Sequence, residues 1–243
     1  MPDSQLTLPL PKEADGGYRF QHSLVIICEG LSDREFFRRF IAARNLPHFD
    51  IPFPHDPGDD SIEKQKHIFG GKKRFPNMLR ATKAADNIKG VLLVIDSADD
   101  PNATLNEARQ YIQDAGDYAV PSTFMQLATD GDAAPPVAIA TMPPNEPGGL
   151  ETLCYQAMVR ANGPIGGCIE TLCGSANVNS WNPEKQGKAR LQCMVAVLNQ
   201  EDPNKALRYV FTLNPPLIPL TDSAFDVVEK LLRDFAQLAG VTI

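Results

Sequence analysis

The sequence predicts an α/β fold with a mainly parallel sheet and helices on both of its faces. Three short, continuously apolar segments each have the length and the β-branched content of a buried strand. They are residues 23–28, 91–95 and 137–141. Segments with helical spacing of apolar residues separate them, and this alternation is typical of parallel sheets. We therefore expect a three-layer sandwich that carries a helical C-terminal extension.

Helix signals follow the expected strands. Ser32 and Glu35 have the spacing of a capping box, and Asp100 before Pro101 predicts the N-terminus of another helix. Further helices are expected at residues 76–86, 150–160, 184–199 and 223–239. Two weaker strands are expected at residues 49–53, despite Pro52, and at residues 206–212, at an edge of the sheet. Residues 163–183 are rich in Gly and Asn, and we assign no element to them.

The composition narrows the class of protein. The 23 Lys and Arg against 30 Asp and Glu give a net charge of −7, which argues against an evenly basic surface that coats nucleic acid but leaves room for a local basic patch. The five cysteines follow no disulfide framework, so we expect reduced thiols. No apolar run reaches the ~18 residues of a transmembrane helix, and residues 1–17 lack the apolar stretch of a signal peptide. We expect a cytoplasmic protein that does not bind membranes.

The chain divides into three parts. We expect a flexible segment at residues 1–20, an α/β domain at residues 21–160, and an extension at residues 161–243 that packs on the same domain. The sequence leaves open whether this extension is a lid, the interface of a homodimer or simple packing.

Acidic residues follow three of the expected strands. Because the carboxyl ends of parallel strands meet at one edge of the sheet, we expect these side chains to lie together. Such a cluster repels itself unless protons or a divalent cation neutralise it, and ligands that offer only oxygen suit Mg²⁺ or Mn²⁺. The candidate metal ligands are Glu29, Asp33, Asp96, Asp99, Asp100 and Glu151.

Several of these acids also have a structural explanation. Asp33 and Glu151 lie at expected helix N-termini, where the helix dipole stabilises negative charge, and Asp100 is a good N-cap. Glu29 and Asp96 directly end apolar strands and have no such explanation, so the functional interpretation is favoured for these two.

A basic segment lies between the first two strands. A flexible loop with this charge could contact phosphates of DNA or RNA, although a solvated loop is an equally good interpretation. Its candidate nucleic-acid-binding residues are Lys64, Lys66, Lys72, Lys73 and Arg74. The spacing of a P-loop is missing here, and no G-x-S-x-G motif of a serine hydrolase occurs in the chain.

Two segments resemble motifs of the TOPRIM domain. The sequence VIICEGLSDREFF, with Glu29 and Asp33, resembles its first motif, and VLLVIDSADDP, with Asp96, resembles its second. Glu151 in GGLETL resembles a further acid of TOPRIM nucleases related to the OLD family. The resemblance covers residues 22–160, and the remainder resembles the extension of small standalone TOPRIM-like proteins.

The resemblance implies a Rossmann-like fold that uses Mg²⁺ to make or break phosphodiester bonds. Glu29 would serve as metal ligand or general acid/base, and Asp33 and Asp96 would help to hold two metal ions about 4 Å apart. TOPRIM nucleases often bring a late lysine to the scissile phosphate, for which Lys188 is the candidate, with a solvated helix start as the alternative. The leading hypothesis is a metal-dependent nuclease.

The chain departs from the TOPRIM pattern at one position. A strict D-x-D that starts at Asp96 requires an acid at position 98, where this chain has Ala98. Asp99 or Asp100 could bend back and substitute; otherwise the second metal and nuclease activity are in doubt. The departure favours an alternative, a non-catalytic module that works beside a partner ATPase, as TOPRIM-like proteins do in phage defence.

A third hypothesis is a receiver-like domain. Asp96 would accept the phosphoryl group, Glu29 would assist Mg²⁺ binding, and Thr141 would be the switch residue. Receivers usually have two adjacent acids after the first strand, whereas Cys28 precedes Glu29 here, and they are about half as long as this chain.

Overall fold

A parallel sheet forms the centre of the molecule. The computed structural model describes residues 20–52, 71–83, 85–129, 133–144 and 146–241. Within them the sheet contains β1 (Leu24–Ile27), β2 (Gly90–Asp96) and β3 (Val137–Met142), in that order and all parallel. The predicted α/β class and the three principal strands are therefore confirmed. Residues 1–19, most of the predicted N-terminal segment, lie outside the described residues.

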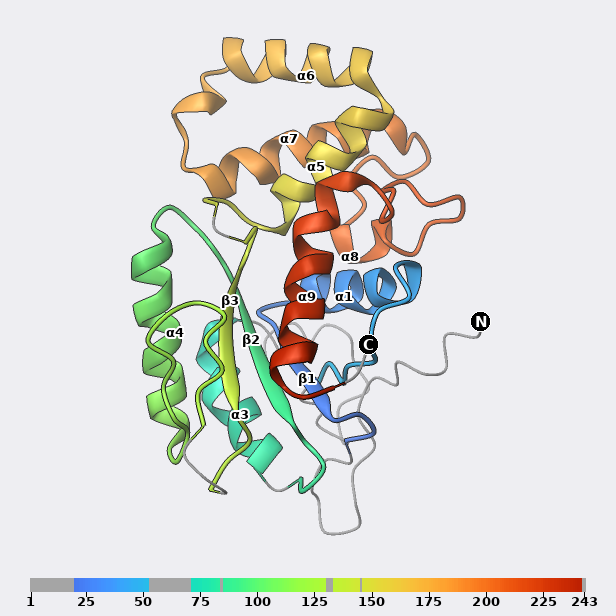
Figure 1. Cartoon of the computed structure of the whole chain (residues 1–243). Coiled ribbons are helices and arrows are strands. Elements are labelled where there is room, and N and C mark those ends of the chain that lie inside the picture. Colours follow the sequence, from blue (N-terminus) through green and yellow to red (C-terminus); the bar gives the residue numbers. More distant parts are fainter. Residues whose placement is uncertain (1–19, 53–70, 84, 130–132, 145, 242–243) are drawn as a thin grey trace, which may run out of the picture.

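Helices cover both faces of this sheet, which gives the Rossmann-like layering (Figure 1). Helices α3 (Phe75–Lys83) and α4 (Pro101–Ala115) lie on one face, and α1 (Leu31–Ala43) and α9 (Asp226–Leu238) lie on the other. Alternate strand residues enter two separate apolar clusters. Leu24 and Ile26 pack in the cluster that includes Phe36, whereas Val25 and Ile27 pack in the cluster that includes Ile112.

The remaining helices lie beyond the carboxyl ends of the strands (Figure 1). They are α5 (Leu150–Ala161), α6 (Gly163–Ser175), α7 (Pro183–Leu198) and α8 (Leu207–Val210), with short 3-10 helices η2 (Lys72–Arg74), η3 (Val178–Ser180) and η4 (Ser223–Phe225). Leu191, Met194 and Phe235 belong to the same buried cluster as Leu24. The C-terminal extension thus shares the core of the sheet.

Two of the weaker predicted strands differ from the structure. The edge strand expected at residues 206–212 is wrong, because this segment forms the helical turn α8, with Val210 fully buried, and packs on α1 instead of the sheet. Of residues 49–53, Asp50 makes a single bridge to Val25. Pro52 has no N–H to donate to a neighbouring strand, so it cannot extend this pairing. Residue 53 lies outside the described part.

The first helix begins differently from the prediction. Gly30 is the N-cap of α1, and its N–H donates to Asp33 Oδ2 at 2.8 Å. Asp33 therefore occupies the position that the sequence suggested for Glu35, which instead pairs with Arg38 and Arg39. The Ser32–Glu35 capping box is wrong, because the helix starts two residues earlier than that box requires.

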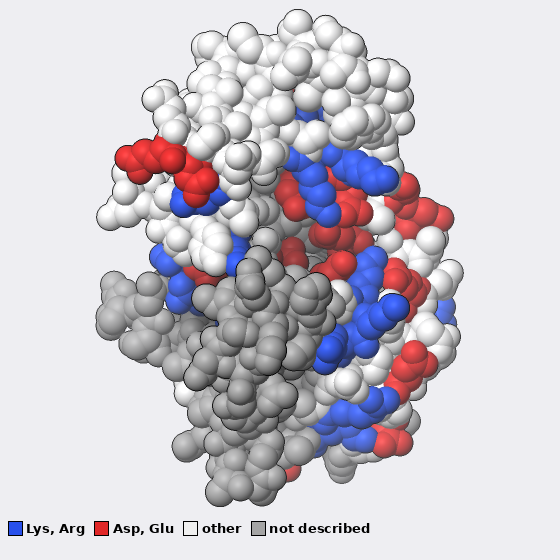
Figure 2. All heavy atoms as spheres, turned by 180° about the vertical axis from the view of Figure 1, so that it is seen from behind, with Lys and Arg blue, Asp and Glu red and all other residues white. Residues whose placement is uncertain are grey.

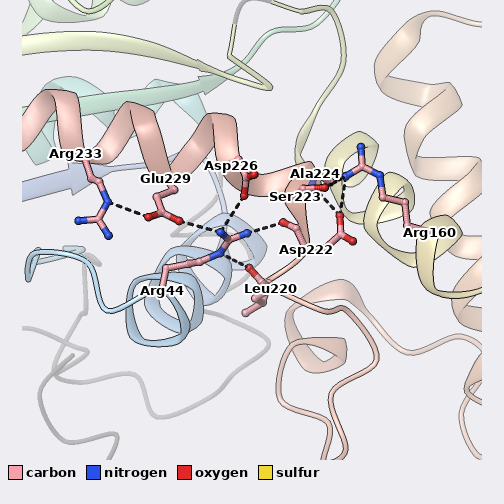
Figure 3. A network of polar contacts seen from close by, with 9 residues as sticks. All are labelled: Arg44, Arg160, Leu220, Asp222, Ser223, Ala224, Asp226, Glu229 and Arg233. Carbon is pink, nitrogen blue, oxygen red and sulfur yellow. Dashed lines mark hydrogen bonds and ion pairs between the residues drawn. The ribbon is translucent and has the colours of Figure 1, made fainter.

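Arg44 connects the first helix to the last (Figure 3). Its side chain is 13% exposed and pairs with both Asp226 and Glu229 at 2.9 Å. It also donates to the carbonyl oxygens of Leu220 and Asp222. One guanidinium satisfies two acceptors in the first turn of α9 and two in the segment before it, and so fixes α1 and α9 together on one face of the sheet.

We predict that Arg44→Met lowers the free energy of unfolding by roughly 2–4 kcal/mol, because it leaves partly buried acceptors and acids without their donor. The matched control is Lys230→Met on α9, whose side chain is 75% exposed and pairs with Asp234 in the same helix. Its effect is expected within about 0.5 kcal/mol. Urea unfolding measures both. Equal stabilities of the two variants would contradict this role of Arg44.

Candidate functional site

Four acidic side chains meet where the parallel strands end. Glu29 follows β1, Asp33 lies in the first turn of α1, Asp96 is the last residue of β2, and Glu151 lies in the first turn of α5. All four are partly buried. We call them the acid cluster. Figure 2 shows acidic side chains gathered in a hollow of the surface, with Lys and Arg at its borders.

Gly149 lies beside two carboxylates of the acid cluster. A Cβ atom at this position would lie 3.1 Å from Glu151 Oε2 and 3.2 Å from Asp96 Oδ2. Two carboxylates from different elements therefore flank the same backbone position, and only glycine leaves that space open. The end of β2 and the start of α5 thus bring Asp96 and Glu151 to the same backbone position.

A backbone bridge holds these two elements together. Ala98 N–H donates to the Gly148 carbonyl at 3.0 Å, and Gly148 N–H donates back to the Ala98 carbonyl at 2.9 Å. Ala98 adopts a positive φ of 51° to make this bridge. The position where a D-x-D motif would have its second acid is therefore the anchor of the loop that carries Glu151.

The electrostatics of the cluster reflect burial and mutual repulsion. Burial, together with the charges of Glu151 and Glu29, raises the pKa of Asp33 to about 7. Burial, then Asp33, Glu151 and Glu29, raise the pKa of Asp96 to about 9. Burial also raises the pKa values of Glu29 and Glu151. At neutral pH the cluster thus retains protons that solvated carboxyl groups would lose.

One oxygen of the cluster lacks a partner. Glu29 Oε2 is buried and accepts no hydrogen bond from the residues that the structure describes. Buried polar atoms are almost always hydrogen-bonded in proteins, so an orphaned carboxylate oxygen points to a water molecule, a cation or a ligand as its partner.

Two lysines border the acid cluster. Lys72 begins η2 and pairs with Glu107 of α4 at 3.0 Å, and Lys188 of α7 pairs with Glu184. The charges of both lysines lower the pKa of Glu29, although burial outweighs them. Burial lowers the pKa of each lysine. The hydrogen bonds and charges of the nearby acids raise it by more, so the net shift is upward and both ammonium groups stay charged.

Close helix packing positions Lys188. A Cβ atom on Gly187 would lie 2.7 Å from Thr152 Oγ1, so glycine lets α7 approach the first turn of α5. Lys188 follows directly and is exposed. Burial raises the pKa of Glu151, and the charge of Lys188 lowers it in part.

The other predicted site residues lie elsewhere. Asp99 and Asp100 are exposed, and Asp100 accepts the N–H of Asn102 at 2.8 Å, which is the predicted capping role. Lys73 is exposed and Arg74 partly buried, in η2. Thr141 is buried within β3. Lys64 and Lys66 lie outside the described residues.

The sequence analysis missed three residues of this region: Glu107, Tyr111 and Glu184. Glu107 and Tyr111 are four residues apart on α4 and interact at 2.8 Å, and Glu184 is four residues before Lys188. The i, i+4 spacing was visible in the sequence, but the partner of Glu107 is 35 residues away and no local pattern reveals it.

The four acids lie near one another, but their carboxylates do not surround a common point. Among the side chains that the structure describes, no three His, Cys, Asp or Glu residues stand close enough to hold a metal ion as they are placed. Binding of a cation would therefore require the carboxylates to converge.

Comparison with known proteins gives one match. Residues 23–234 match the family described as "Protein of unknown function (DUF3226)". No curated protein and no solved structure matches the chain. Among the described residues, no helix is long and apolar enough to cross a membrane.

The raised pKa of Asp96 predicts how stability depends on pH without metal. The folded protein keeps a proton on Asp96 up to a pH of about 9, whereas the unfolded chain releases it near its ordinary pKa of 3.8, so stability falls as pH rises between the two values. Asp96→Asn removes this loss and should raise the free energy of unfolding at pH 8 by at least ~1 kcal/mol relative to wild type.

Thermal unfolding in a chelating buffer between pH 5 and about pH 8 measures this difference. Asp99→Asn, which changes an exposed acid three residues away, should leave the pH dependence unchanged. Parallel pH profiles of wild type and Asp96→Asn would contradict the prediction.

Proposed function

The chain belongs to the DUF3226 family of proteins of unknown function, and we propose that it is a Mg²⁺- or Mn²⁺-dependent enzyme of the TOPRIM type that cleaves phosphodiester bonds in DNA or RNA. The observation that carries the proposal is the meeting of Asp96 and Glu151 at Gly149, bordered by lysines. The five cysteines are free thiols, which suits a reducing compartment such as the cytoplasm.

The donor set suits a hard divalent cation. Asp33, Asp96 and Glu151 offer only carboxylate oxygens, which Mg²⁺ and Mn²⁺ prefer. Burial, and after it the repulsion among the carboxylates, raises the pKa of Asp33 to about 7 and of Asp96 to about 9, and a cation would offset both effects. This gain would favour convergence of side chains that are not yet at ligand distance. When bound, the metal would polarise the phosphate and lower the pKa of a water molecule.

The chain's own residues supply the remaining chemistry. The orphaned Oε2 of Glu29 can accept a proton from an attacking water molecule, which is the role of a general base. Lys72 lies on η2 and Lys188 on α7, both at the border of the cluster, so the two ammonium groups can offset the charge of the phosphate.

Glu151 offers an answer to the missing second acid of the D-x-D motif. The Ala98–Gly148 bridge leads into the turn where Glu151 lies beside Asp96. We propose that Glu151 replaces the acid that position 98 lacks, so that Asp99 and Asp100 need not bend back.

A non-catalytic module that assists a partner such as an ATPase is the second candidate. Ala98 and the lack of a preformed metal site among the described residues favour it. The two candidates differ in whether metal binding is followed by cleavage.

Metal binding is the first test. We predict that wild type binds Mn²⁺ in calorimetry, that Asp96→Asn weakens binding about tenfold or more, and that the matched control Asp99→Asn leaves it unchanged. The expected loss arises because Asp96 is at the centre of the cluster whereas Asp99 is exposed. Wild type that binds no Mn²⁺ at about 10 mM, or equal losses in both variants, would contradict the metal site.

Cleavage is the second test. We predict that Glu29→Gln and Lys188→Met each lower Mn²⁺-dependent cleavage of labelled DNA or RNA oligonucleotides by about 10²-fold or more, because they remove the base and a phosphate contact. Lys185→Met, an exposed lysine of the same helix, is the control and should stay active. Metal binding without any cleavage would favour the non-catalytic module.

A further inference from the structure

The backbone of Lys72 lies beside the acid cluster. The N–H of Gly71 donates to the carbonyl oxygen of Glu29 at 3.2 Å, which ties the start of η2 to the end of β1. Lys72 is the next residue. Burial lowers its pKa, and the hydrogen bond to Glu107 and the charges of Glu29 and Asp96 raise it. A flexible lysine that begins here has acids within its electrostatic reach.

The ammonium nevertheless pairs with an acid that is not one of the four of the acid cluster, although the charge of Glu107 still raises the pKa of Glu29. Lys72 Nζ lies 3.0 Å from Glu107 Oε2 on α4. The lysine side chain is 23% exposed and that of Glu107 is 41% exposed, so the pair lies at the border of the hollow. The contact joins segments 35 residues apart, unlike the i, i+4 pair of Lys188 with Glu184 that a helix provides by itself.

Glu107 is itself held in place. Tyr111 Oη donates to Glu107 Oε1 at 2.8 Å, which leaves Oε2 for Lys72. The Tyr111 ring packs edge-on against Phe75, with centroids 5.5 Å apart, and Phe75 is fully buried. The carboxylate is thus fixed on both oxygens by a chain of contacts that reaches the core.

We propose that Glu107, oriented by Tyr111, is a positioning residue that keeps the Lys72 ammonium out of the acid cluster and so leaves the carboxylates free for a divalent cation. The inference rests on the proposed function, because it concerns the same metal site. Without the charge of Glu107, the nearest acids for Lys72 are those of the cluster, where its ammonium would act as a built-in counterion and compete with the metal.

The test is a double-mutant cycle with Mn²⁺ alone as the probe, measured by calorimetry on the full chain. Glu107→Gln should weaken Mn²⁺ binding about tenfold, since Lys72 enters the cluster. Lys72→Met should bind at least as tightly as wild type. The double variant Glu107→Gln/Lys72→Met should recover the affinity of Lys72→Met, because the competing ammonium is gone.

Two further variants sharpen the cycle. Tyr111→Phe removes only the hydroxyl that orients Glu107, and it should weaken binding in the same direction by about two- to threefold, again with recovery by Lys72→Met. Asp114→Asn removes the same charge from an exposed position of α4 and should change nothing. Circular dichroism confirms that each variant is folded.

The outcomes separate this inference from the proposed function. If wild type binds Mn²⁺ but Glu107→Gln binds equally well, or if its loss persists in the double variant, the positioning role is overturned and the metal site stands. If wild type binds no Mn²⁺, both are overturned. Recovery in the double variant cannot arise from a structural role of Glu107, because that role would not depend on Lys72.

Discussion

Repulsion among carboxylates at one edge of the sheet is the constraint to which the surrounding structure responds. The parallel strands and the helices that follow them bring four acids to that edge, namely Glu29, Asp33, Asp96 and Glu151. Because these side chains are partly buried, water screens their charges less than it would at the surface. Two neighbouring features lessen this repulsion: protons retained on Asp33 and Asp96, and two lysines at the border. A protein with no use for the cluster would be more stable with uncharged side chains there.

The rest of the fold holds these acids in place. Apolar clusters on both faces fix the strands, and Arg44 fixes α1 to α9 through four acceptors. The Ala98–Gly148 bridge and the close approach at Gly187 fix the start of α5 and of α7 relative to β2. Elements from distant parts of the sequence thus converge on one small region, although the carboxylates themselves are not at ligand distance from a common point.

Much of this arrangement was predictable from the sequence. Continuous apolar runs predict the buried strands, and the rule that parallel strands share a carboxyl edge brings Glu29, Asp96 and Glu151 together. The predicted Ser32–Glu35 capping box was wrong, because the helix has Gly30 as its N-cap and Asp33 accepts the N–H of that residue. The predicted strand at residues 206–212 was wrong, because this segment forms α8 and packs on α1 instead of the sheet. Glu107 was missed, since its role arises from a tertiary contact with Lys72.

We propose that the acid cluster binds a divalent cation between Asp96 and Glu151. The most direct measurement is anomalous diffraction from a crystal soaked in Mn²⁺. The account predicts a strong anomalous peak beside Gly149 that is bonded to carboxylate oxygens of both Asp96 and Glu151, with those side chains drawn together relative to a metal-free crystal. A fully soaked crystal with no peak at the cluster, or with peaks only at other surface acids, would contradict it.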